Sequence, residues 1–241
     1  MLFVHGAWHA SWCWEENFIP YFVEKGFSCS AFDLRGHGQS EGLGHLNDYS
    51  LEDYAKDLDQ QVGALEKPPV LIAHSMGGLV AQKYSQDHKV AGLILVAPVP
   101  LDGVGYGYGR SHPIPFLKFL FLRKGFAMIS GKKLARSLLF SPALPEGLFE
   151  KYYGKLQGES FKALTETARG VERKPLMGNP PLLIVEAGGD AVIPTKRLAE
   201  TAKFYGISVS TLDNVAHDLM IDVEWKRAGE LIGLWLDKNG F

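Results

Sequence analysis

Val70-Leu-Ile-Ala-His-Ser75-Met-Gly-Gly78 is the stretch that decides the fold of this chain. An apolar segment runs into Ser75, small residues stand two positions before and after it (Ala73 and Gly77), and an amphipathic helical pattern follows at once. A serine at a sharp strand-to-helix turn has a strained backbone, so its neighbours at these two positions must be small. The stretch therefore predicts a turn that projects the Ser75 hydroxyl beside the free N–H groups of a helix start, the environment of an activated nucleophile.

A nucleophilic serine needs a base, and the base needs an acid that orients it. The run 181–186 predicts a late strand, and Asp190 follows it beyond a Gly-Gly turn. After one further strand, predicted over 207–212, a loop carries His217, the only histidine in the last third of the chain. Serine, acid and histidine follow this order in catalytic triads built on such a turn. We therefore predict that Ser75, Asp190 and His217 act together.

Attack on a carbonyl also requires backbone N–H donors for the oxyanion that forms. One donor is the residue after the serine, here Met76, and the other comes from an earlier loop that follows a strand. The apolar run 2–4 predicts that strand, and His5-Gly6 follows it, where glycine lets the backbone turn its amide inward. We predict Ala7 and Met76 as the two donors.

With these motifs the chain resembles the α/β-hydrolase fold superfamily over nearly its whole length. The loop 32–40, Phe-Asp-Leu-Arg-Gly-His-Gly-Gln-Ser, is similar to the D-x-R-G-x-G-x-S loop of that family. The opening 5–14, His-Gly-Ala-Trp-His-Ala-Ser-Trp-Cys-Trp, resembles the plant methylesterase and hydroxynitrile lyase branch. The ending Ala216-His217-Asp218-Leu-Met220, followed by Trp225, resembles many bacterial members. The resemblance implies a fold and a triad, and names no substrate.

The choice of acid has rivals. Asp102 follows the strand expected over 90–96, and some members of the superfamily take the acid from that strand. Asp213 and Asp218 are close to His217 in sequence, but neighbours along a loop seldom face the same ring nitrogen. We favour Asp190.

Three other histidines lie near the predicted motifs. His74 is adjacent to Ser75, but adjacent side chains at a sharp turn diverge, so we expect His74 to pack beneath the turn. His37 and His45 lie in a glycine-rich loop, where we expect structural or solvated roles.

The composition of the chain limits the kinds of partner and the cellular location that we expect. The chain has 241 residues, 46% of them hydrophobic, which suffices for one large core, and a formal net charge of −2. Without a basic tail we expect no nucleic-acid partner. The sequence lacks a run of about eighteen apolar residues and a signal-peptide pattern. Two cysteines, Cys13 and Cys29, without metal-ligand spacing favour buried, reduced thiols in a cytoplasmic protein.

Predicted strands and helices alternate along most of the chain, which indicates an α/β fold with a mostly parallel sheet and helices on both faces. We assign residues 1–100 and 179–241 to this α/β-hydrolase core. Residues 101–178 interrupt the alternation after the sixth strand of the family and, by resemblance, form a helical cap over the active site. The chain begins almost on its first strand, so we expect either a minimal sheet or further residues upstream.

Local signals predict individual elements. A helix is expected near 14–24, followed by a strand over 27–32. Ser50 and Asp53 have the spacing of a capping box, so a second helix should begin there and run to about residue 65.

The predicted cap differs in charge from the core. Residues 101–178 carry 13 basic and 6 acidic side chains, or +7, which leaves 12 basic and 21 acidic, or −9, elsewhere. We favour a solvated cap surface. The alternative is a positive, aromatic lid that prefers acidic or lipid-like substrates or contacts a membrane surface. Phe116, Phe119 and Phe121 crowd one apolar run, which predicts a largely apolar acyl pocket over Ser75.

The resemblance implies hydrolysis of small-molecule carboxylic esters with small to medium apolar acyl groups, without cofactor or metal. A hydroxynitrile lyase is the alternative. Those relatives carry a lysine just after the catalytic histidine and depart from His-Gly, whereas this chain has Asp218 and Gly6. A ligand-binding relative without activity is a further alternative, which an intact triad disfavours. The oligomeric state stays open.

Overall fold

One parallel sheet organises the molecule. The computed structural model describes residues 1–241 and contains a six-stranded sheet in the order β2-β1-β3-β4-β5-β6, in which every neighbouring pair is parallel. The strands are β1 (Leu2–Val4), β2 (Ser30–Phe32), β3 (Val70–His74), β4 (Gly92–Val96), β5 (Leu182–Ala187) and β6 (Ser210–Leu212). The predicted α/β class with a mostly parallel sheet is confirmed.

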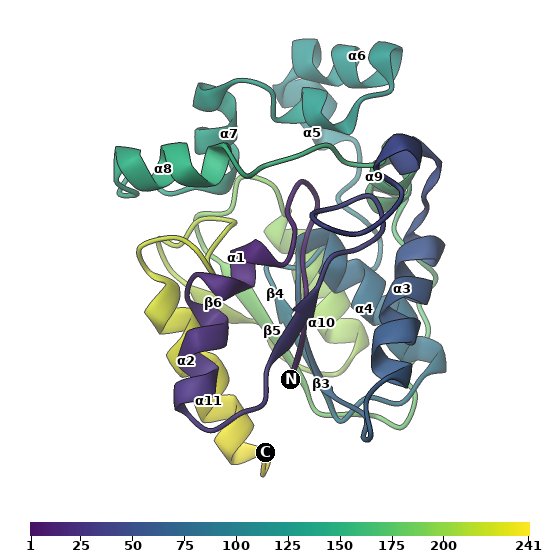
Figure 1. Cartoon of the computed structure of the whole chain (residues 1–241), viewed down its shortest axis with the longest axis vertical. Coiled ribbons are helices and arrows are strands. Elements are labelled where there is room, and N and C mark those ends of the chain that lie inside the picture. The colour runs from purple at the N-terminus through teal and green to yellow at the C-terminus, as the bar shows by residue number, and fades with distance from the viewer.

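Helices cover both faces of the sheet (Figure 1). The core helices are α1 (Trp12–Glu15), α2 (Phe18–Glu24), α3 (Leu51–Gly63), α4 (Ser75–Asp87), α10 (Thr195–Phe204) and α11 (Trp225–Lys238), with a 3-10 helix η1 (Leu43–Asp48). α2 packs against α11 on one face, and α3 packs against α4 on the other (Figure 1). None of the helices combines the length and the apolar character that crossing a bilayer would require.

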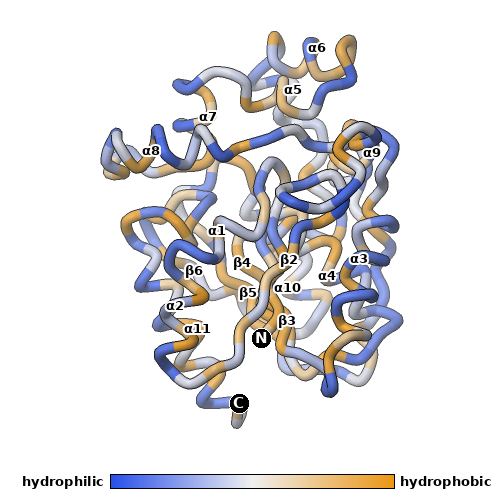
Figure 2. Tube along the Cα trace, viewed as in Figure 1, coloured by the Kyte–Doolittle hydropathy of each residue, from blue (hydrophilic) through white to orange (hydrophobic).

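The central strands form the core because both of their faces are covered. All five residues of β3 and all five of β4 are buried, and within them residues 70–73 and 93–96 read as continuous apolar runs rather than alternating ones. Figure 2 shows this apolar centre between helices of mixed hydropathy. The edge strands β2 and β6 are shorter than the predicted 27–32 and 207–212.

Two helix predictions had different outcomes. The capping box is confirmed, since Ser50 Oγ accepts from the Asp53 N–H and the Asp53 carboxylate accepts from the Ser50 N–H, and α3 follows it. The single helix expected near 14–24 is wrong, because the segment divides into α1 and α2. Pro20 lacks the N–H that would bond the carbonyl four residues earlier, and a new start at Phe18 moves it into a first turn, where no bond is needed.

Residues 101–178 lie between β4 and β5 and fold into their own helices. These are α5 (Gly107–Ser111), α6 (Pro113–Leu122), η2 (Gly125–Met128), α7 (Lys132–Leu139), α8 (Glu146–Tyr153) and α9 (Phe161–Arg169). They lie beyond the end of the sheet opposite the chain termini (Figure 1). A buried Glu159 joins this segment to the core, because its carboxylate is 3.0 Å from His37 Nε2 and accepts from Tyr54 Oη at 2.8 Å.

Candidate active site

The parallel register brings the predicted site residues to one edge. Val4 of β1 pairs with Ala73 of β3, and β3, β4 and β5 all run in the same direction. The loops after these strands therefore meet at the carboxyl edge of the sheet, where ligands bind in open α/β folds.

Ser75 lies on the strained turn that its neighbours predict. Its φ is +50°, in the left-handed region that non-glycine residues rarely adopt, and its side chain is buried between β3 and α4. A Cβ on Gly77 would lie 2.2 Å from the carbonyl oxygen of His5, so only glycine fits there. A Cβ on Gly6 would lie 2.9 Å from the Cβ of Ser75. The turn depends on close backbone approach from both sides.

Ser75, His217 and Asp190 form one hydrogen-bonded chain. Ser75 Oγ is 2.9 Å from His217 Nε2, and His217 Nδ1 is 2.7 Å from Asp190 Oδ2. The other carboxylate oxygen of Asp190 accepts from the N–H groups of Val192 and Ile193 at 2.7 and 3.0 Å, which fixes its orientation. The arrangement is that of a nucleophile, a base and an orienting acid.

The charges around His217 suit its role as a base. Burial disfavours a charged His217, but the Asp190 carboxylate beside it, with a contribution from Asp218, outweighs burial and raises the pKa of His217. His74 is buried, as expected for a side chain packed at the turn, with its Nε2 3.1 Å from the carbonyl oxygen of His217. Burial holds the pKa of His74 well below its ordinary value, so this ring is neutral.

The rival acids have other partners. Asp102 forms an exposed ion pair with Arg173, whose guanidinium lowers the pKa of the Asp102 carboxyl. Asp218 is buried, and its Oδ2 is 3.0 Å from His9 Nε2. Among Asp102, Asp190, Asp213 and Asp218, only the Asp190 side chain hydrogen-bonds the His217 ring.

His9 connects the loop that carries Ala7 to the loop that carries His217, a role that sequence reasoning missed. Its Nδ1 is 2.7 Å from the carbonyl oxygen of Ala7, and its Nε2 faces Asp218, which directly follows His217. Ala7 and Met76 line the same cavity as Ser75, and Met76 lies in the first turn of α4, where N–H groups have no partner within the helix. The oxyanion role of these two amides stays a prediction.

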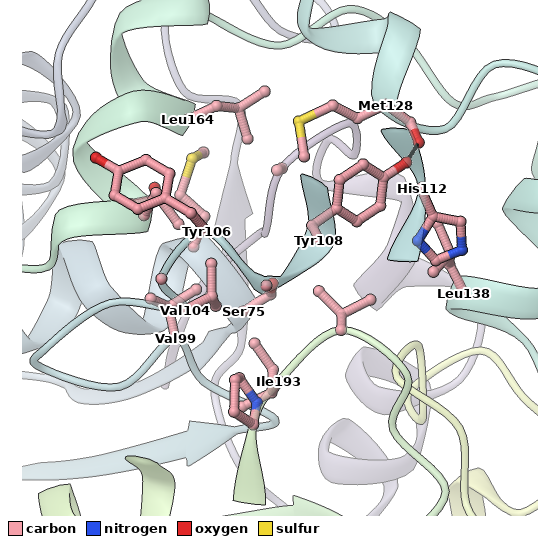
Figure 3. A pocket seen from close by; sticks show the side chains of 18 of the residues that line it. Ser75, Val99, Val104, Tyr106, Tyr108, His112, Met128, Leu138, Leu164 and Ile193 are labelled. Atoms are coloured by element: carbon pink, nitrogen blue, oxygen red, sulfur yellow. Dashed lines mark hydrogen bonds between the residues drawn. The ribbon is translucent and has the colours of Figure 1, made fainter. Parts of the chain in front are cut away.

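A cavity of about 470 Å³ lies above Ser75, bounded by both the core and residues 101–178. Figure 3 shows apolar side chains around the serine. The lining residues that the motifs did not single out include Val99, Val104, Tyr106, Tyr108, His112, Met128, Leu138, Leu164 and Ile193. Their signal in the sequence is weak, because each is one apolar or aromatic position in a short helix or loop.

The phenylalanine run lines the cavity only in part. Phe116 and Phe119 face it, whereas the Phe121 side chain is 82% exposed, so its placement in the pocket was wrong. Two residues along a helix correspond to a rotation of about 200°, which turns Phe121 away from the side occupied by Phe119.

His37 and His45 have structural and solvated positions, as expected. His37 is buried against Glu159, and His45 lies 78% exposed. His74, His217 and Asp218 are close enough to share a metal ion. However, both ring nitrogens of His217 are already bonded, to Asp190 and Ser75, so this donor set fits a proton-transfer chain better than an ion. Cys13 and Cys29 are free, and only Cys13 is fully buried.

With the fold and the site described, comparison with known proteins identifies the class. The model of the alpha/beta hydrolase family matches residues 1–227. The chain belongs to the alpha/beta hydrolase family, which confirms the predicted superfamily.

Individual relatives include hydrolases. A pyrethroid hydrolase of Sphingobium wenxiniae is 32% identical over 101 residues, which cover 41% of this chain and 35% of that protein. The match thus spans about a third of that relative's length. A non-heme haloperoxidase of Rhodococcus erythropolis is 27% identical over 225 residues, covering 84% of this chain and 78% of the relative. A monoacylglycerol lipase structure from Paleococcus ferrophilus has a TM-score of 0.70 at 21% identity, over 99% of this chain and 94% of that one, and shows the shared fold.

Proposed function

We propose that this chain is a serine hydrolase that cleaves carboxylic esters of small to medium apolar acids through an acyl-enzyme. One observation carries the proposal: Ser75 Oγ, the His217 ring and the Asp190 carboxylate are joined at 2.9 and 2.7 Å at the floor of an apolar cavity. A nucleophile, a base and an oriented acid are the parts that acyl transfer requires.

The reaction uses the groups of this chain in two stages. His217 Nε2 takes the proton of Ser75 as Oγ attacks the ester carbonyl, and the N–H groups of Ala7 and Met76 hold the oxyanion. His217 then returns the proton to the alcohol as the carbon–oxygen bond breaks. In the second stage His217 removes a proton from water, which attacks the acyl-enzyme, and the released Ser75 takes that proton back.

The surroundings of His217 favour hydrolysis over cyanohydrin cleavage. The residue after His217 is Asp218, which is buried against His9 rather than facing the cavity, so no cation stands where the lyases of the resembling branch carry lysine. A developing cyanide anion would therefore lack a charged partner.

Covalent labelling tests the proposal directly. A fluorophosphonate probe should add to the intact protein and map to the Ser75 peptide. Ser75→Ala should abolish labelling and lower ester turnover by about 10⁴-fold or more. Labelling of a different serine, or unchanged turnover in Ser75→Ala, would contradict the proposal. Binding of an ester without turnover by the wild-type chain would favour the non-catalytic alternative.

A further inference from the structure

Helix α6 exposes an unusual amount of apolar surface. Ile114, Leu117, Phe121 and Leu122 are 67%, 49%, 82% and 58% exposed, and we call these four side chains the outer face of α6. The helix lies at the end of the molecule farthest from the chain termini (Figure 1). Contiguous exposed apolar side chains on a soluble fold mark a site of interaction.

The other side of the same helix lines the cavity. Phe116 and Phe119 face the space above Ser75, so the helix is apolar on both sides. The inner side also supplies a packing contact with the rest of the chain, because Phe119 is buried and its ring packs against Phe161 of α9. With ten residues α6 is too short to cross a bilayer, but it is long enough to lie along its surface.

The charge around the outer face has one sign. Between Gly103 and Pro145 the chain has seven basic residues and no acidic one. Three of them, Arg110, Lys118 and Lys124, lie on α6 or within three residues of its ends, and we call this group the basic rim. No side chain of the rim forms an ion pair within the molecule. Arg123, which follows α6, does not belong to the rim, because its guanidinium lies over the ring of Phe161, and Phe161 packs against Phe119 on the inner side of the helix. An apolar strip bordered by unpaired cations is complementary to a surface that offers hydrocarbon and negative charge together.

We propose that the outer face and the basic rim dock this protein on an anionic lipid bilayer. The apolar side chains enter the level of the acyl chains, and the lysine and arginine side chains meet the phosphates. A second copy of the chain is a poorer occupant, because pairing of the two outer faces would bring two basic rims together. Docking would place the cavity one helix away from the lipid. The proposal does not depend on the chemistry of Ser75.

Vesicle sedimentation of the full chain tests the proposal, with Ser75→Ala as the starting protein so that no lipid is hydrolysed. The protein should bind vesicles of equimolar phosphatidylcholine and phosphatidylglycerol at least about tenfold more tightly than vesicles of phosphatidylcholine alone, and salt should weaken that binding. The triple variant Ile114→Ser, Leu117→Ser, Phe121→Ser and the double variant Lys118→Glu, Lys124→Glu should each lose at least about tenfold in affinity for the anionic vesicles.

Matched controls separate docking from general stickiness. Val23→Ser with Leu234→Ser removes apolar side chains that are 52% and 69% exposed on the core helices, and it should leave vesicle binding unchanged. When the triple variant is made in the wild-type chain, which keeps Ser75, its turnover of a soluble ester should equal that of the wild type, since none of the three substituted residues lines the cavity. Equal binding to both vesicle types, no binding, or unchanged binding in the triple variant would overturn the proposal. A dimer of the wild-type chain that the triple variant dissolves would also overturn it, because a second copy would then occupy the face.

Discussion

His9 and Asp218 are 209 residues apart in sequence and bonded in the interior, with Nε2 of His9 3.0 Å from Oδ2 of Asp218. Both ring nitrogens of His9 face oxygen atoms, because Nδ1 lies 2.7 Å from the carbonyl oxygen of Ala7. The loop after β1 is therefore bonded to the residue that follows His217. The two loops that supply an oxyanion donor and the base in the proposed mechanism share this contact.

Removal of one member of this pair should damage stability. His9→Ala leaves the buried Asp218 carboxylate without its hydrogen-bond partner, and the free energy of unfolding should fall by about 3–5 kcal/mol, measured by urea denaturation. Asp218→Asn can donate its amide N–H to His9 Nε2 and should cost much less. Additive losses in the double variant His9→Ala, Asp218→Ala would show that the two residues do not interact.

The assignment of Asp190 as the acid is tested by comparing variants of two carboxylates, Asp190 and Asp102. Asp190→Asn should lower kcat by about 10⁴-fold, because the amide favours the wrong tautomer of His217. Asp102→Asn is the control and should lose little activity, since Asp102 pairs with Arg173 at the surface. Steady-state kinetics of both variants decide the matter, and a larger loss in Asp102→Asn would move the acid to the earlier strand.

The pH dependence follows from the raised pKa of His217. The base must be neutral to accept the proton of Ser75, so kcat/KM should rise with pH as His217 loses its proton. Because Asp190 raises the pKa of His217, the midpoint should lie above the value of about 6.5 of an ordinary imidazole. In Asp190→Asn the residual activity should show a lower midpoint, as burial then dominates. A wild-type midpoint below that of Asp190→Asn would contradict the assignment.

The cavity predicts a preference for longer acyl chains. Each buried methylene contributes up to ~0.8 kcal/mol, so kcat/KM should rise at least ~10-fold from acetyl to hexanoyl esters. Phe116→Ala removes a ring that lines the cavity and should reduce this rise. Phe121→Ala removes an equal ring that is 82% exposed and should leave the rise unchanged. A steady fall in kcat/KM from acetyl onwards would mean that the helices close the site rather than line it.

Much of this molecule was predictable because its signals are local. The strained turn at Ser75 needs small residues at fixed offsets, and Gly77 lies where a Cβ would collide with backbone. Strands buried on both faces read as unbroken apolar runs, and the capping box at Ser50 is a contact between residues three apart. That the loops carrying Ser75, Asp190 and His217 can meet also follows from the direction of the strands, because every strand of a parallel sheet delivers its following loop to the same edge.

The sequence by itself determined the parallel α/β fold and singled out Ser75 and His217. Only the tertiary structure decided which acid faces His217, that Phe121 turns away from the cavity, and that His9 bonds to Asp218. The physical reason is separation along the chain. Backbone sterics and capping act within a few residues and leave a pattern in the sequence. A contact between residues 209 apart depends on how two loops pack, and that packing leaves no periodic trace in either loop.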